Sequence, residues 1–217
     1  MLVEEIMTKN VVTLKKEDTI RRAHTILQEN KFHHIPIVDD NNAVIGIISD
    51  RDIRDALPSI FEDEWKEEVM NRSVAEIMEE DVKVVHPFEF VEEIAAIFYE
   101  KEISCLPVVS EGNLVGIVTD KDMLNTLINL TGALTPSSQI EVRVRNIPGT
   151  LAGVVNLIAD EHLQINNVLV YPDQSDDNFK IIVLRVQTMN PYAIVTKLKN
   201  NGHEVLWPNF PGISGNV

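Results

Sequence analysis

Two short segments of the chain carry the same polar pattern. In one, Ser49 is followed three positions later by Asp52, and in the other Thr119 is followed by Asp122. A hydroxyl residue and an acid at this spacing are typical of a capping box, in which both side chains accept hydrogen bonds from free N–H groups at a helix start. The same N–H groups and the positive end of the helix dipole also suit a phosphate or a ribose edge. The pattern therefore indicates either a structural cap or a ligand contact.

A cation lies inside each of these segments, Arg51 in the first and Lys121 in the second. A cation in the first turn of a helix opposes the helix dipole, so capping does not explain its presence. Pairing with a phosphate does explain it, because guanidinium and ammonium groups bind phosphate oxygens strongly. A solvated surface cation is the alternative interpretation.

Other residues that could do chemistry are few. The adjacent His33 and His34 are as typical of packing or of a surface position as of a ligand site. Cys105 enters an apolar stretch without a His or Asp partner pattern, so we expect a buried small hydrophobic residue and not a nucleophile. The histidines lack metal-ligand spacing, and the chain has no phosphate loop, nucleophile elbow or dinucleotide fingerprint. We expect a non-catalytic protein that requires no metal or cofactor.

The composition excludes several classes of partner. The 217 residues carry a formal net charge of −15, which repels nucleic acid over most of the surface, although a local cluster of cations leaves room for a small phosphorylated ligand. No apolar run reaches the length of a membrane span, and the acidic start is unlike a secretory or transit peptide. With one cysteine, the chain forms no internal disulfide. We expect a soluble cytoplasmic protein without nucleic-acid or membrane partners.

The two polar segments belong to an internal repeat. Three motifs recur in one order with a single-residue gap: residues 3–7 as 74–78, residues 35–38 as 106–109, and residues 46–52 as 116–122. Several motifs in one order do not arise by chance, so the chain contains two copies of one supersecondary unit.

Each copy is predicted to fold in the order β-α-β-β-α. A short β-branched stretch, at 11–14 or 82–85, precedes an amphipathic helix, then two apolar strands joined by a turn, and a last helix that begins at Ser49 or Thr119. The strand faces are too small to form a core alone. We therefore expect the two copies to pack on each other.

These motifs resemble the CBS domain family, and their tandem arrangement resembles a CBS pair. The match covers about residues 3–130 and includes the Ile-Met start, the Pro-Val strand and the closing Gly-x-x-Ser/Thr-x-x-Asp. The resemblance implies an α+β fold with one CBS domain and a connector over 1–71 and a second CBS domain over 72–134. It also implies an adenine nucleotide, AMP or ATP, as a regulatory ligand between the copies.

The resemblance further implies residue roles. In nucleotide-binding CBS domains the closing aspartate accepts hydrogen bonds from the ribose hydroxyls, with the Ser or Thr nearby, and a basic residue before the Pro-Val strand faces the phosphates. Because both copies keep the pattern, we prefer ligand contact to capping alone. Ser104 and Cys105 replace the two histidines in the second copy, so unequal sites are expected. The predicted nucleotide-binding residues are Thr13, His33, His34, Ser49, Arg51, Asp52, Thr119, Lys121 and Asp122.

A different pattern begins at residue 138. A strand near 140–144, a helix from 151, a hairpin over 165–171 and 179–186, a helix over 192–200 and a strand over 204–207 form the ferredoxin-like order β-α-β-β-α-β. With Pro148 and Gly149 at the first turn, residues 138–210 resemble an ACT domain. This implies an amino-acid ligand at Asn146, Pro148 and Gly149. The usual acid of this turn is Asn146 here, so for Gly149 we prefer the interpretation of a tight turn that needs glycine.

The leading hypothesis is a sensor, in which a bound nucleotide changes the packing of the CBS copies and the ACT domain, or a partner protein held through it, reports the change. The segments 58–62, 130–133, 188–191 and 201–203 resemble acetoin utilization proteins, which implies a role in acetoin or related carbon metabolism. The alternatives are a structural dimerisation adaptor without ligand and an amino-acid sensor acting through the ACT domain. An exposed sheet edge or apolar face in either domain type needs cover, so we expect a homodimer.

Overall fold

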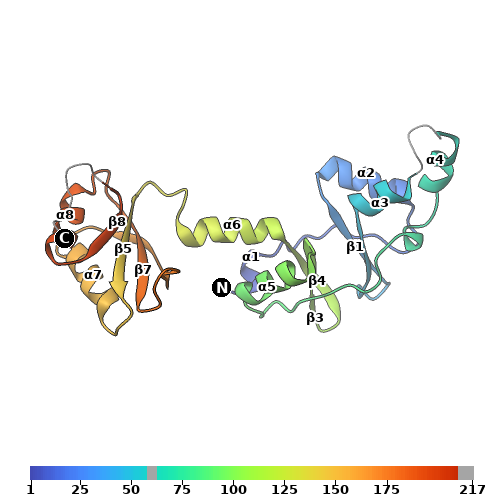
Figure 1. Cartoon of the computed structure of the whole chain (residues 1–217). Helices are drawn as coiled ribbons and strands as arrows, with labels where there is room; N and C mark the ends of the chain where they lie inside the picture. Colours follow the sequence, from blue (N-terminus) through green and yellow to red (C-terminus); the bar gives the residue numbers. More distant parts are fainter. Residues whose placement is uncertain (58–62, 210–217) are drawn as a thin grey trace. The chain divides into compact units, whose positions relative to one another are not determined.

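A computed structural model describes residues 1–57 and 63–209, with the backbone alone over 63–66. The segment 58–62 and residue 210, both used in the predictions above, lie outside the described residues. The chain divides into two compact units, Met1–Leu124 and Asn125–Val217. Helix α6 (Asp120–Thr131) begins in the first unit and ends in the second (Figure 1).

The first unit contains both repeats. Its other elements, in chain order, are α1 (Val3–Ile6), α2 (Ile20–Asn30), β1 (His34–Val38), β2 (Val44–Ser49), α3 (Asp50–Ala56), α4 (Asp63–Met70), the 3₁₀ helix η1 (Val74–Glu76), α5 (Val91–Lys101), β3 (Cys105–Ser110) and β4 (Asn113–Thr119). In each repeat the two strands form an antiparallel hairpin, and the last helix begins directly after Ser49 or Thr119, as predicted.

The β-branched stretches at 11–14 and 82–85 are shorter as strands than predicted. Each is reduced to one parallel bridge, Leu14 to Ile37 and Val85 to Val108. The cause is a proline in the facing strand. Leu14 donates to the Pro36 carbonyl, but Pro36 has no N–H with which to extend the ladder, and Pro107 limits the second repeat in the same way.

The opening segments of the two repeats are exchanged. Val3 packs in the core of the second repeat with Val85, Ile94 and Leu106, and its N–H donates to the Glu89 carbonyl at 3.0 Å. The equivalent Val74 is buried in the core of the first repeat, among residues that include Leu14, Ile20 and Ile35. Each core therefore contains part of the other repeat, which confirms that the two copies pack on each other.

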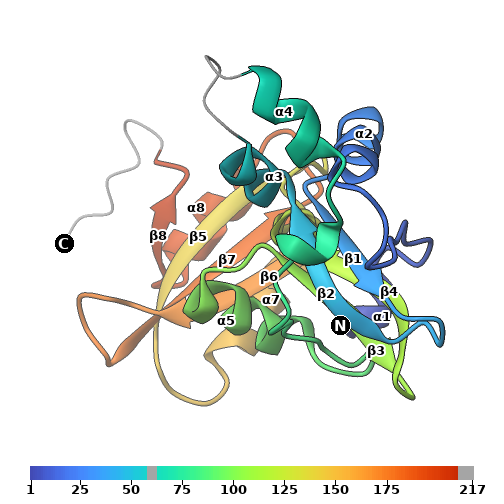
Figure 2. The same ribbon diagram turned by 90° about the vertical axis from the view of Figure 1, so that its right-hand side faces the viewer.

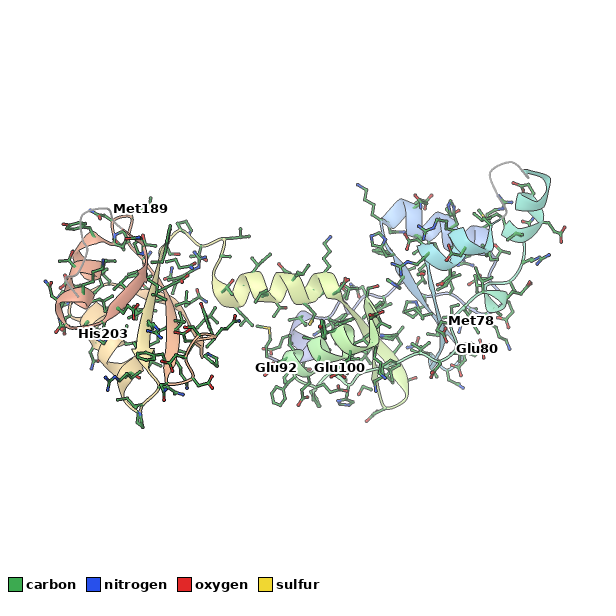
Figure 3. The ribbon with its side chains drawn as sticks, viewed as in Figure 1. Met78, Glu80, Glu92, Glu100, Met189 and His203 are labelled. Atoms are coloured by element: carbon green, nitrogen blue, oxygen red, sulfur yellow. The ribbon has the colours of Figure 1, made fainter. Side chains whose placement is uncertain are left out.

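A methionine follows each exchanged segment and covers a glycine of the other repeat. A Cβ atom on Gly46 of β2 would lie 2.6 Å from the sulfur of Met78, which is labelled in Figure 3. A Cβ atom on Gly116 of β4 would lie 2.5 Å from the sulfur of Met7. Backbone bridges from Ile47 to Glu79 and from Thr8 to Ile117 accompany these contacts. Glycine is thus required for close approach at both positions, and we refer to the two contacts as the Met–Gly clasps.

The second unit has the predicted β-α-β-β-α-β order. Its elements are β5 (Ser138–Arg145), α7 (Thr150–Ala159), β6 (Ile165–Pro172), β7 (Phe179–Val186), α8 (Tyr192–Asn200) and β8 (Glu204–Trp207). The strands form one antiparallel sheet in the order β6-β7-β5-β8 (Figure 2). One sheet face packs against α7 and α8 through a core that includes Val142, Leu184 and Val195. The other face presents Gln139, Glu141 and Arg143 of β5, which alternate with the core residues.

Among the described helices, none combines the length and the apolar character that a membrane crossing needs.

Candidate functional site

The start of α3 is a complete capping box. Ser49, the last residue of β2, accepts a hydrogen bond from the Asp52 N–H on its Oγ atom at 3.2 Å. In return, Asp52 Oδ2 accepts from the Ser49 N–H and from the Ser49 hydroxyl, both at 2.7 Å. The local spacing of these residues therefore forms the structural cap that it predicts.

The start of α6 repeats this geometry. Asp122 Oδ2 accepts from the N–H of Thr119 at 2.8 Å and from its hydroxyl at 2.7 Å. In the described part of the chain no hydrogen bond reaches the Oδ1 atom of either Asp52 or Asp122, and both residues are half-buried. Capping and ligand contact are therefore compatible, because each aspartate uses one oxygen for the cap and keeps the other.

The two cations beside these caps are uncommitted. The side chains of Arg51 and Lys121 are exposed, and neither forms an ion pair or a side-chain hydrogen bond with another described residue. Arg54, on the same helix as Arg51, lies 3.6 Å from Asp55. A cation next to acidic first-turn residues that remains unpaired is available for an anionic ligand.

The two histidines occupy different environments. His33 is exposed, with its Nδ1 atom 3.4 Å from the Asp50 carboxylate. His34 lies opposite Ser49 in the β1–β2 pairing and is half-buried. Burial lowers the pKa of His34, although the carboxylates of Asp50, Asp52 and Asp120 act in the opposite direction. His34 is thus within electrostatic range of carboxylates from the first turns of both α3 and α6.

Ser104 joins the two repeats at this point, and the sequence reasoning missed it. Its Oγ atom lies 3.3 Å from His34 Nε2. The signal was its position, since Ser104 is the repeat counterpart of His33. Neighbouring Cys105 is buried opposite Thr119, as expected, and burial followed by the charges of Asp122 and Asp120 raises its pKa to about 12.

The structure brings His34, Ser49 and Asp52 together through strand pairing and the cap. Thr13 is the last of the predicted nucleotide-binding residues. It is half-buried next to Leu14, and its hydroxyl has no hydrogen bond within the described residues. Its contact with a nucleotide stays a prediction.

In the second unit, the turn before α7 is tight. Gly149 has a φ of 90° and forms the N-cap of α7, so a side chain there would be strained, which supports the interpretation of Gly149 as a turn residue. Asn146 and Pro148 are exposed, and the Asn146 N–H donates to the Asn178 carbonyl at 2.7 Å.

A cavity of about 310 Å³ lies beside this turn, but Asn146, Pro148 and Gly149 do not line it. Its lining includes Arg143 and His203, the latter labelled in Figure 3. The guanidinium of Arg143 is already committed, since it lies 2.6 Å from Asp173 Oδ2 and 3.3 Å from Glu204 Oε2. Hydrogen bonds from Ser175 and then from Arg143 lower the pKa of Asp173 to about 2.

Comparison with protein families agrees with both resemblances. The CBS domain model matches residues 3–59 and 74–129, and the ACT domain model matches residues 138–203. A structure described as an acetoin utilization protein (AcuB) from Vibrio cholerae is 33% identical, with a TM-score of 0.55, over 64% of this chain and 98% of that chain. About a third of this chain therefore has no counterpart in that structure.

Two similar structures contain adenosine-type ligands. The CBS domain pair of protein MJ0100, in complex with 5′-methylthioadenosine and S-adenosyl-L-methionine, is 30% identical with a TM-score of 0.51, over 58% of this chain and 95% of that one. CBSX2 in complex with AMP is 26% identical with a TM-score of 0.51, over 58% of this chain and 96% of that one.

A homoserine O-acetyltransferase of Methanococcus vannielii is 31% identical over 58% of this chain, and the match spans 25% of that enzyme.

Proposed function

Because the chain belongs to the CBS domain family and carries an ACT domain, we propose that it is a non-catalytic regulatory sensor. Its ligand is an adenine nucleotide, AMP or ATP, bound where α3 and α6 begin. The observation that carries this proposal is duplicated: at both helix starts an aspartate keeps one oxygen without a partner among the described residues, and an unpaired cation stands beside it. The hydroxyls of a ribose can donate hydrogen bonds to the free aspartate oxygen, and the negative charge of a phosphate can pair with the cation.

The known ligands of related CBS pairs support the adenosine part of this ligand. AMP, 5′-methylthioadenosine and S-adenosyl-L-methionine share an adenosine group and differ in what is attached to its 5′ carbon. Arg51 and Lys121 favour an attached phosphate, since each is a cation without a carboxylate partner among the described residues. The proposal includes a role in acetoin or related carbon metabolism, for which the similarity to the Vibrio cholerae protein is the support. It also includes the cytoplasmic homodimer that is predicted from the sequence.

Replacing the aspartates by asparagine separates ligand contact from capping. The amide oxygen of Asp52→Asn can still accept the two Ser49 hydrogen bonds of the cap, while the outward oxygen becomes an NH₂ donor that repels ribose hydroxyl protons. We expect Asp52→Asn and Asp122→Asn each to lower affinity at their own site by about ten- to a hundredfold, with little change in melting temperature. Calorimetric titration with AMP and ATP measures the affinity.

The matched variant Asp52→Ala removes both functions and should lower the melting temperature as well as the affinity. If both asparagine variants bind AMP and ATP as the wild type does, the aspartates are caps only and the proposed site is wrong.

A further inference from the structure

Helix α6 connects the proposed nucleotide site to the ACT sheet through one continuous hydrogen-bonded element. Its first turn is capped by Thr119 and Asp122 in the first unit. Its last turn, up to Thr131, belongs to the second unit together with the ACT domain. The contacts of this last turn therefore determine whether a structural change at the first turn of α6 reaches the ACT sheet.

The last turn ends in a closely packed contact with β6. Gly132 is buried with a φ of 64°, and the bonds from its N–H to Asn129 and from the Ala133 N–H to Ile128 close the helix in a Schellman motif. The side chain of Asn167 in β6 donates to the Leu130 carbonyl at 2.6 Å. A Cβ atom on Gly132 would overlap Asn167 Oδ1. The positive φ of Gly132 strains any side chain, and Asn167 leaves no space for one.

The placement of Asn167 depends on an irregularity in the sheet. The β6–β7 register shifts between Ile165 and Asn167, so one residue, Asn166, is left out of the pairing and Asn167 re-enters it opposite Arg185. A bulge of this kind re-aims a side chain. Here it coincides with the residue that binds the carbonyl at the end of α6.

A polar row lies next to this contact on the sheet face that α7 and α8 leave uncovered. Arg185 donates to Gln139 at 3.0 Å, and Gln139 donates to Glu141 at 2.6 Å. Thr131 and Asn167 line a cavity of about 320 Å³ together with these three residues. The end of α6 therefore lines one cavity together with polar residues of β5, β6 and β7, which are three of the four strands of the sheet.

We propose that Asn167 is a latch that fixes the end of α6 to the ACT sheet and thereby couples nucleotide occupancy at Thr119 and Asp122 to the ACT domain. This coupling rests on the proposed nucleotide site. A ligand that binds the free Asp122 oxygen favours one arrangement of the first turn of α6. The intact helix carries this bias to Leu130, and the Asn167–Leu130 hydrogen bond passes it to β6.

Hydrogen exchange on the full chain, with and without saturating AMP, tests the latch. In the wild type we expect AMP to slow the exchange of amides in the last turn of α6 and in β6. Asn167→Ala should still bind AMP but lose the nucleotide-dependent slowing in β6. Gly132→Ala disrupts the same contact from the helix side and should also lose the nucleotide-dependent slowing in β6. The control is Asn166→Ala, which changes the adjacent asparagine. The Asn166 side chain has no hydrogen bond within the described residues, so this variant should keep the wild-type response.

The outcomes separate the two proposals. If calorimetry detects no AMP or ATP binding, the proposed function fails and the coupling fails with it. If the wild type binds AMP but β6 exchange does not change, or if Asn167→Ala keeps the full response, the nucleotide site stands and the latch is overturned.

Discussion

Arg51, His33 and His34 surround the capped start of α3, whereas the capped start of α6 has Lys121, Ser104 and Cys105 at the equivalent positions. The caps themselves agree to within about 0.2 Å in every hydrogen bond. The Met–Gly clasps are equally alike. The duplication has therefore kept the geometry that builds each helix start and changed the charges around it. The shared features build both helix starts, and we expect the features that differ to determine the ligand preference of each site.

The clasps provide the largest test of the shared geometry. Gly46→Ala and Gly116→Ala each place a Cβ within 2.6 Å of a methionine sulfur, so each should destabilise the protein by about 1–3 kcal/mol, and by similar amounts. Chemical denaturation measures the loss. Gly153→Ala is the control: this helical glycine has open space around its Cβ position, and alanine there should be neutral or stabilising. A large inequality between Gly46→Ala and Gly116→Ala would show that the repeats are not equivalent in their packing.

Arg51 and Lys121 provide the test of the difference in charge between the two helix starts. Arg51→Ala should weaken ATP binding by about tenfold, and more than Lys121→Ala does, because guanidinium binds phosphate in a two-pronged geometry that ammonium does not match. AMP, with fewer phosphates, should lose less. Arg54→Ala removes the same charge from the same helix, at a position beside Asp55, and should leave affinity nearly unchanged. Equal losses for Arg51→Ala and Lys121→Ala with both nucleotides would contradict the asymmetry.

His34 provides a smaller, pH-dependent difference. Its pKa is lowered by burial, so between the ordinary value near 6.5 and the lowered one the unfolded chain binds more protons than the folded chain. Stability therefore rises with pH through this window and is lost on acidification. Cys105, the equivalent residue, has a pKa of about 12 and contributes nothing there.

We expect the melting temperature of the wild type to fall between about pH 7 and 5 more steeply than that of His34→Gln. His33→Gln, which removes one of the charges that lower the pKa of His34, should reduce the slope less than His34→Gln does. Parallel curves for the wild type and His34→Gln would contradict the lowered pKa of His34.

The caps and the element order were predictable because they depend on local spacing. Ser49 and Asp52 are close in sequence, and the apolar periods that define α2, α5 and the ACT strands are visible within single segments. The contact of His34 with Ser104 was not predictable, since it joins segments about seventy residues apart and the alignment of the repeats does not show which side chains meet. The strands at 11–14 and 82–85 were predicted too long because the limiting prolines, Pro36 and Pro107, lie in the partner strands. The Asn167 latch depends on a β-bulge, which the alternation of apolar residues along the strand does not predict.

The exchange of Val3 and Val74 between the two cores also determines when the chain can fold during synthesis. As the first repeat leaves the ribosome, its core lacks Val74 until the start of the second repeat has been made. The opening helix, in turn, has no core to enter until the strands around Leu106 and Val118 follow. Neither repeat has a complete interior before nearly all of the first unit exists, so the pair is expected to fold late and as one cooperative body.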